Sequence, residues 1–209
     1  MKRLLFLMVA FVMTLASNAQ DAVGTLSLKP MAGMTIANFI GSDAEGTDTK
    51  LGAIFGGELI YQANSYLALS AGLLYSMQGC SADGEGDPKM NLDYINLPVL
   101  ANIYVFKGFA LKAGLQLGYL TRAKVSGSGD GIKAEVDMKD ACNDFDLSIP
   151  IGVSYDINNS FVIEGRYNVG ITKVGKSKYS FMGETYHDDE TDIRNGVFQI
   201  TLGYKFALK

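Results

Sequence analysis

The stretch "VFQITLGYKF", Val197 to Phe206, decides the fold of this chain. Large apolar side chains occupy every second position, and Gln199, Thr201, Gly203 and Lys205 lie between them. Successive side chains of a β-strand point to opposite faces of the sheet, so this alternation predicts a strand with one apolar and one polar face. The rest of the chain shows which kind of β-protein uses such a strand.

The first residues are set apart as an export signal. Lys2 and Arg3 precede a thirteen-residue apolar run, Leu4–Ala16, and small residues follow up to Ala19. This order is typical of a secretory signal peptide, and we expect cleavage after Ala19, with residues 1–19 removed and 20–209 left as one domain. The apolar run is too short for a membrane-spanning helix, which needs about 20 residues.

The mature chain is acidic and rich in glycine and aromatic residues. Removing Lys2 and Arg3 from the 18 basic residues leaves 16 against 22 acidic ones, a net charge of about −6. This balance argues against nucleic acid as a partner, because such proteins carry basic patches that neutralise phosphates. The full sequence has 24 glycines, 11 tyrosines and 11 phenylalanines, of which only Phe6 and Phe11 fall in residues 1–19, and this composition suits strands and turns.

The same alternation returns in seven further segments, so we predict eight strands. The seven segments are 25–39, 53–62, 66–76, 93–106, 109–120, 145–155 and 160–174. Strands of ten or more residues exceed the usual length of about 5–6 and match what a tilted strand needs to cross a bilayer. Pro98 and Pro150 interrupt two of these strands, and we place both near one rim, where a bulge would accommodate them.

The connections between these strands alternate in length. Short ones follow the second, fourth and sixth strands, and long polar ones follow the first, third, fifth and seventh, at 41–50, 79–91, 126–144 and 175–195. Short turns at one end, long loops at the other and an even strand number are typical of outer-membrane barrels. We therefore predict an all-β fold, an eight-stranded antiparallel up-and-down transmembrane β-barrel in the bacterial outer membrane, spanning residues 20–209.

The polar faces carry charges that we expect inside this barrel. They are Lys29, Glu58, Lys112, Asp146, Glu164, Arg166 and Lys205. Four positive and three negative charges nearly balance. An eight-stranded barrel is only wide enough for side chains to fill it, whereas porins use about 16–18 strands. The interior is therefore predicted to be a network of ion pairs with no open pore.

Three stretches carry a resemblance to a known family. "LDYINLPVLANIYV" (92–105), "FVIEGRYNVGIT" (161–172) and "RNGVFQITLGYKF" (194–206) resemble the PorT-like outer-membrane β-barrel proteins of Gram-negative bacteria. That family usually carries a glutamate and a lysine where this chain has Asn96 and Asn102. The resemblance implies a monomeric eight-stranded barrel. Phe206 resembles the terminal aromatic residue that the barrel-assembly machinery reads, although three further residues follow it here. A part in a secretion apparatus, the role of the member that gave the family its name, is one alternative.

His187 is the only histidine of the chain and raises the question of catalysis. Acidic residues 188–190 follow it, and Ser177 and Ser180 precede it in the same loop. Some small barrels are lipid-modifying enzymes with a histidine and a serine or acid at the rim, so a rim enzyme acting on lipid or peptide is a second alternative. A triad needs rigid geometry, and an acidic loop is more typical of a solvated surface. We expect no catalytic, cofactor-binding or metal-binding residue.

The loops hold two cysteines and several acidic clusters. Cys80 and Cys142 are expected in the second and third long loops, which lie at the same end of the barrel. Exported proteins form disulfides, so these two cysteines could be bonded, and the sequence leaves open whether they lie close enough. The acidic clusters lack the twelve-residue calcium-loop pattern. The expected role is structural or one of surface interaction. The expected partners are outer-membrane lipids, lipopolysaccharide, the assembly machinery and a surface or secretion partner.

Overall fold

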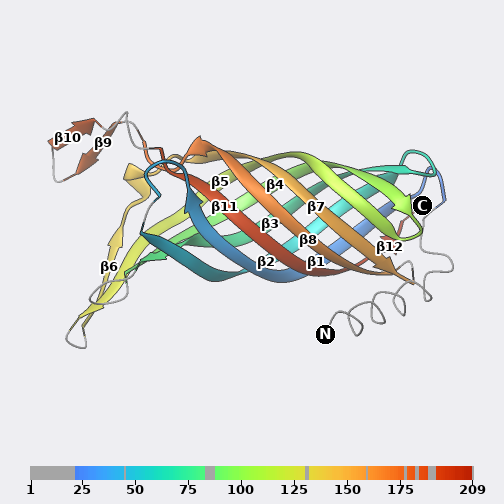
Figure 1. Ribbon diagram of the computed structural model, residues 1–209, viewed down its shortest axis with the longest axis horizontal. Helices are drawn as coiled ribbons and strands as arrows, with labels where there is room; N and C mark the ends of the chain where they lie inside the picture. Colours follow the sequence, from blue (N-terminus) through green and yellow to red (C-terminus); the bar gives the residue numbers. More distant parts are fainter. Residues whose placement is uncertain are drawn as a thin grey trace.

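The computed structural model describes residues 22–44, 46–82, 88–129, 132–158, 160–176, 178–181, 184–187 and 192–208. The predicted signal peptide lies outside these residues. Eight long antiparallel strands close into a barrel (Figure 1), which confirms the predicted fold. They are β1 (Leu26–Ile40), β2 (Thr47–Gln62), β3 (Leu67–Ala82), β4 (Lys89–Phe106), β5 (Phe109–Gly129), β7 (Phe145–Ile157), β8 (Phe161–Lys173) and β11 (Arg194–Tyr204).

Four shorter strands and one helical turn lie outside the eight long strands of this barrel. Strand β12 (Phe206–Ala207) continues β11 and pairs with β1. Strand β6 (Ile132–Asp137) pairs with β5 and forms with it a hairpin that projects beyond the barrel (Figure 1). Strands β9 (Lys178–Phe181) and β10 (Glu184–His187) form a separate hairpin, and η1 (Lys139–Ala141) precedes β7. The sequence predicted Phe206 as part of the closing strand but not the other additions.

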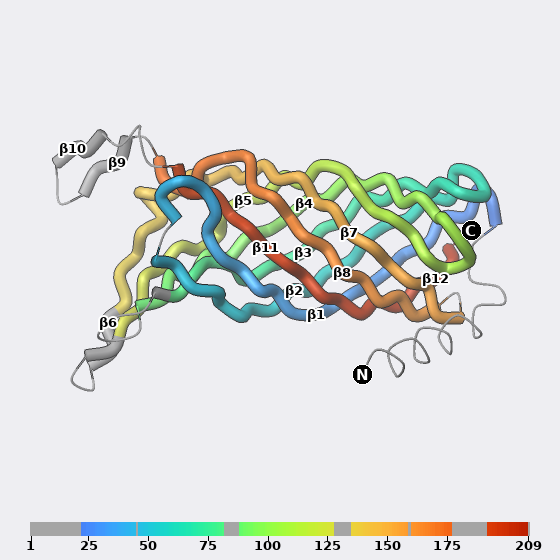
Figure 2. Tube along the Cα trace, in the orientation of Figure 1, coloured from blue at the N-terminus to red at the C-terminus, as the bar shows by residue number. Residues whose placement is uncertain are grey.

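The barrel closes because β1 pairs on both of its edges. Lys29 lies opposite Glu58 of β2, and Thr35 lies opposite Gln199 of β11. Figure 2 shows the first and last long strands side by side. Closure satisfies the backbone groups that an open sheet edge would expose to lipid. The alternating segment near the C-terminus is therefore the strand that completes the ring.

The connections lie as the length pattern predicts, although several strands are longer than expected. Connections 63–66, 107–108 and 158–160 gather at one end, and the long ones gather at the other (Figure 2). Cys80 was expected in a loop, but it lies in β3 and pairs with Met90 of β4, so that placement was wrong. The strands are longer than predicted because their cross-strand hydrogen bonds continue beyond the last alternating apolar residue. These bonds satisfy the backbone N–H and C=O groups whether lipid or water surrounds the strand.

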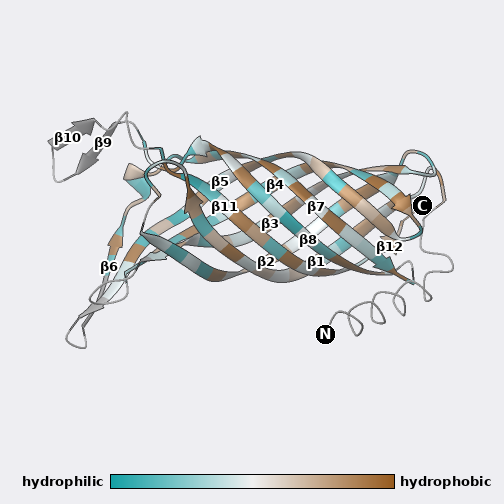
Figure 3. Ribbon diagram, viewed as in Figure 1, coloured by the Kyte–Doolittle hydropathy of each residue, from teal (hydrophilic) through white to brown (hydrophobic). Residues whose placement is uncertain are grey.

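The outer and inner faces of the barrel reverse the arrangement of a water-soluble protein. Large apolar side chains cover the outside, among them Phe55, Leu73, Leu115, Ile151 and Leu202, which are 51–60% exposed. Figure 3 shows the resulting alternation of apolar and polar residues along each strand. This apolar belt is the surface that faces lipid. Among the described residues, no helix is long and apolar enough to span a membrane.

Pro98 and Pro150 lie in the middle of β4 and β7, so their predicted position at the rim was wrong. The β3–β4 ladder skips residues 72–73 opposite Pro98, and the β5–β7 ladder skips residues 114–115 opposite Pro150. A proline has no N–H to donate. Each proline therefore occupies a position where one of the two neighbouring ladders is interrupted.

Candidate functional site

Five charged side chains meet inside the barrel and form what we call the ionic cluster. Lys29 Nζ lies 2.9 Å from Glu58 Oε2 and 2.8 Å from Glu164 Oε2. Lys112 Nζ lies 3.2 Å and 2.6 Å from the same two oxygen atoms. Arg166 donates from Nε to Glu164 at 2.8 Å and from Nη2 to both glutamates.

The ionic cluster spans the full width of the lumen. Around the ring of eight strands, β1 and β5 lie opposite each other, four strands apart in either direction. Lys29 on β1 and Lys112 on β5 nevertheless contact the same oxygen atom of Glu164. All five side chains are buried, and such charges must be paired because desolvation would otherwise be costly. The interior at this level is filled.

The other two predicted interior charges lie apart from the ionic cluster. Lys205 forms an ion pair of 2.6 Å with Asp156, which the sequence analysis missed. Asp156 follows Tyr155 on the inward face of β7, so continuing the alternation by one step would have found it. Asp146 accepts hydrogen bonds from Thr172 and Asn195, each at 3.2 Å, and has no cationic partner among the described residues. The interior thus holds four cations and four carboxyl groups.

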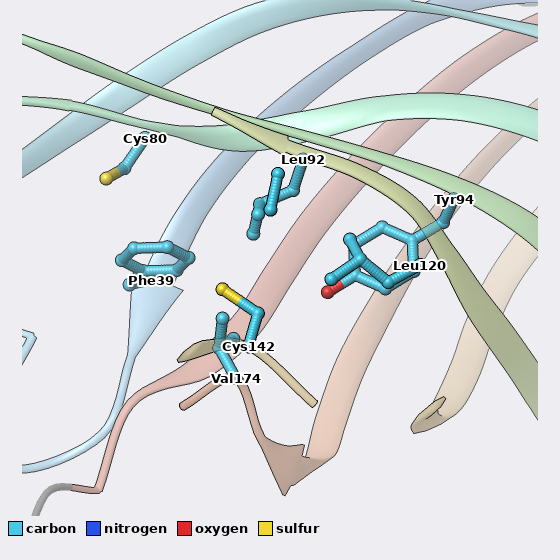
Figure 4. Packing of buried hydrophobic residues seen from close by; sticks show 8 residues of the cluster. Phe39, Cys80, Leu92, Tyr94, Leu120, Cys142 and Val174 are labelled. Atoms are coloured by element: carbon cyan, nitrogen blue, oxygen red, sulfur yellow. The ribbon is translucent and has the colours of Figure 1, made fainter. Parts of the chain in front are cut away.

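An apolar group, here called the mouth cluster, fills the interior at the long-loop end. Its members are Phe39, Cys80, Leu92, Tyr94, Leu120, Ala123, Cys142 and Val174. Figure 4 shows these side chains pointing toward one another from different strands. Cys142 follows η1, and its pairing with Gly175 extends the ladder between β7 and β8, while its side chain packs into the mouth cluster. Apolar packing therefore closes the barrel above its polar interior.

The two cysteines share the mouth cluster as free thiols. In the view of Figure 4, the Phe39 ring lies between them. Burial raises the pKa of the Cys142 thiol to about 11, so this group is protonated at neutral pH. Disulfide formation between Cys80 and Cys142 stays a prediction.

The structure places His187 at the end of β10, where its backbone pairs with Lys178 of β9. Ser180 pairs with Thr185 in the same hairpin, which is separate from the barrel sheet. Ser177 and residues 188–190 lie outside the described part of the chain. Within the part that is described, no group of three or more potential metal ligands occurs.

A chain of polar contacts, not anticipated from sequence, lies on the outer face of β3–β6 above the apolar belt. Tyr75 donates a hydrogen bond of 2.9 Å to Asp93 Oδ2. Arg122 lies 3.8 Å from Asp93 and 3.5 Å from Glu135, which Lys124 contacts at 2.7 Å. Asp93 pairs with Arg122, and the next pair along these strands, Leu92 with Ala123, belongs to the mouth cluster inside the barrel. Successive residues of a strand point to opposite faces, so Asp93 and Arg122 point outward.

A closed antiparallel barrel with an apolar belt outside and ion pairs inside defines a bacterial outer-membrane protein. The chain belongs to the family described as outer membrane protein beta-barrel domain, whose model matches residues 18–176. The protein is therefore located in the outer membrane. No curated protein matches the sequence significantly.

Several solved structures are similar to this chain in fold at low sequence identity. Ail, the attachment invasion locus protein of Yersinia pestis, in complex with the heparin analogue sucrose octasulfate, shares 14% identity over 88% of this chain and 100% of its own, with a TM-score of 0.49. Neisserial surface protein A shares 14% sequence identity over 87% of this chain and 97% of its own, with a TM-score of 0.48. OprG from Pseudomonas aeruginosa shares 14% sequence identity over 91% of this chain and 100% of its own, with a TM-score of 0.46.

Proposed function

We propose that this protein is a closed outer-membrane barrel with a structural or surface-interaction role and without an open pore. The observation that carries the proposal is the ionic cluster. Lys29 and Lys112 reach from opposite walls to one oxygen atom of Glu164, so paired side chains occupy the lumen at that level. A hydrated ion would have to separate these pairs, and breaking a buried ion pair costs about 3–5 kcal/mol.

The mouth cluster is a second barrier in series with the first. Leu92 and Leu120 are fully buried in it, and Cys142 of the connection before β7 packs into it. A passing ion or polar solute would meet apolar side chains before it reached the ionic cluster, and desolvation there is unfavourable. Conduction would need both barriers to open.

The part of the protein that is free to meet partners is the long-loop end. The β5–β6 hairpin and the β9–β10 hairpin project there (Figure 1). On the outer face, Arg122 and Lys124 lie above the apolar belt, and Lys139 Nζ lies 5.8 Å from the centre of the Tyr119 ring. Cationic groups at this height suit the phosphates of lipopolysaccharide, which we propose as a partner together with a protein or ligand at the loops.

The narrower family assignment and the assembly route belong to the same proposal. Of the three stretches that resemble PorT-like proteins, residues 92–105 lie in β4, and their Asn96 and Asn102 are buried in the interior. Phe206 lies in β12, which extends the pairing of β11 with β1 by two residues, and we propose that the assembly machinery reads this end. The proposal includes no catalytic step.

Conductance across a planar lipid bilayer tests the proposal. We expect the refolded protein to give no stepwise current, while a 16-stranded porin gives regular steps under the same conditions. A His187→Ala variant should match the unchanged protein in lipid composition of the host outer membrane, since the role is not enzymatic. Reproducible unitary currents from the unchanged barrel would overturn the closed-barrel proposal, and an altered lipid profile in the variant would favour a rim enzyme.

A further inference from the structure

The interior between the ionic cluster and the mouth cluster has one apolar side and one polar side. Met31, Ile54 and Leu74 of β1–β3 form the apolar side. Polar residues from the remaining strands, here called the polar wall, form the other: Asn96 on β4, Gln116 on β5, Asn168 on β8 and Gln199 on β11. Gln199 pairs directly with Arg166, and Asn168 is the next inward residue of β8 after Arg166.

The polar wall and Arg166 carry buried hydrogen-bonding atoms that no described protein group satisfies. The donors are Arg166 Nη1, Asn96 Nδ2, Asn168 Nδ2 and Gln199 Nε2, and the acceptors at this level are Gln116 Oε1 and Asn168 Oδ1. Each of these five residues is 1–2% exposed. A buried polar atom left unpaired costs about 1–3 kcal/mol, so native proteins rarely keep several together. Arg166 Nη1 can only donate, whereas each amide can turn either its N–H or its oxygen toward it, so this atom needs a species that accepts.

Charge points to the same conclusion. The ionic cluster contains three cations and two carboxylates, and the Lys205–Asp156 pair is neutral by itself. The ionic cluster by itself therefore carries one more positive than negative charge, and the unsatisfied Nη1 atom belongs to one of its cations. Asp146 is too distant, since Ser148 and Pro150 separate it along β7 from Gly152, which pairs with Arg166. An uncompensated charge in a low-dielectric interior is costly.

The surroundings limit the size of the missing acceptor. The apolar belt and lipid lie outside the wall, the mouth cluster lies above it, and the ionic cluster lies below. A small anion that accepts from N–H groups of Arg166 and the neighbouring amides suits a layer enclosed in this way better than a multiatomic one. We propose that the barrel interior holds one monovalent anion of halide size, bound by Arg166 Nη1 and the side-chain amides of Asn168 and Gln199. The site is enclosed by the two clusters that close the proposed barrel, so the inference rests on that proposal, but anion binding is measured without any current.

Bromide provides a direct test, because it scatters anomalously at its absorption edge. The full mature chain is unfolded in urea and refolded into detergent with sodium bromide as the only halide, so that the interior fills during closure. We expect an anomalous difference peak within contact distance of Arg166 Nη1 and Asn168 Nδ2 in crystals of this protein. Ordered water at that position without an anomalous peak would overturn the proposal, and so would bromide found only on the outer surface as an adventitious ion.

A solution measurement with matched variants gives a second test. Ligand binding to the folded state stabilises it by RT ln(1 + [L]/Kd), so the folding equilibrium constant should rise about tenfold for each tenfold rise in chloride above Kd. Arg166→Gln leaves two cations and two carboxylates and should abolish this dependence at constant ionic strength set with gluconate. The control Lys205→Gln/Asp156→Asn removes a neutral interior pair and should keep it. Equal chloride dependence in Arg166→Gln and the unchanged protein would refute the site.

Discussion

Glu164 is the residue on which the ionic cluster depends most. Its carboxylate contacts Lys29, Lys112 and Arg166, and its side chain is 2% exposed. Burying charges this deeply is costly in itself, so the cluster is not a simple source of stability relative to an apolar core. It matters because loss of the Glu164 carboxylate would leave three buried cations with only one carboxylate between them.

We predict that Glu164→Gln lowers the free energy of unfolding by about 3–5 kcal/mol, because three buried cations would then share one carboxylate, that of Glu58. Equilibrium unfolding in urea, in detergent micelles, measures the change. Glu135→Gln is the matched control: Glu135 contacts Lys124 at the exposed hairpin, where ion pairs contribute little, so no measurable change is expected. Equal losses in the two variants would contradict the role assigned to the cluster.

Cys142 is a residue whose burial makes stability depend on pH. Its thiol pKa is raised from about 9 to about 11 by burial, so the folded state favours the neutral thiol. For a raised pKa, the stabilising contribution is complete below pH 9 and is lost as the pH rises through 11. In reduced protein, stability should fall between pH 9 and 11, and Cys142→Ala should remove that part of the pH dependence. A parallel decline in Cys142→Ala would place the titration elsewhere.

The predicted disulfide between Cys80 and Cys142 has a separate test. Both thiols belong to the mouth cluster, and an oxidising envelope favours bond formation if the side chains approach each other. Protein isolated without reductant and unfolded in urea should show no titratable thiol, and two after reduction. Two thiols before reduction would show that burial in one cluster is not followed by oxidation.

At the scale of the element, the side chains that face the barrel interior change from polar to apolar along a single strand. In β4, Asn96 and Asn102 face inward at membrane depth, but Leu92 and Tyr94 face inward at the mouth while Asp93 lies on the outer face. The reversal has a physical reason. Lipid surrounds the middle of the barrel and favours apolar residues outside, whereas water surrounds the mouth and restores the ordinary rule of apolar residues inside.

We predict that Phe39→Ala lowers the free energy of unfolding by about 3–5 kcal/mol, since it removes a large buried side chain from the mouth cluster. Urea unfolding measures the loss, with Val136→Ala as the control, because Val136 is 47% exposed on the projecting hairpin. The variant should still give no current in a planar bilayer, because the ionic cluster below is unchanged. A current in Phe39→Ala would show that the mouth cluster alone closes the barrel.

At the scale of the whole molecule, the ring of hydrogen bonds makes the barrel a cooperative unit with two different ends. Short connections such as 63–66 lie at one end, and the projecting β5–β6 hairpin lies at the other (Figure 1). Every barrel strand is paired on both edges, so no strand can leave without opening two ladders. In a membrane, such opening exposes unpaired backbone groups to lipid.

Orientation and closure are predicted together. An epitope tag placed between residues 129 and 132 should be accessible on intact cells, and one placed in connection 63–66 should become accessible only after the outer membrane is permeabilised. Unheated protein should also migrate differently from boiled protein on a denaturing gel, because the closed ring survives detergent until heat unfolds it. Surface exposure of the tag in 63–66 would reverse the assigned orientation.

The sequence alone was sufficient for the number of barrel strands, the ends at which they connect and the face on which Lys29, Glu164 or Lys205 lies. These properties are local, since period-two alternation follows from strand geometry, and lipid then requires the sheet to close. The tertiary structure alone decided that Lys29 and Lys112 share one oxygen atom of Glu164, that Cys80 and Cys142 lie in one apolar cluster, and that β5 continues beyond the membrane. Contacts across the lumen depend on the stagger and tilt of all eight strands at once, and no single strand carries that information.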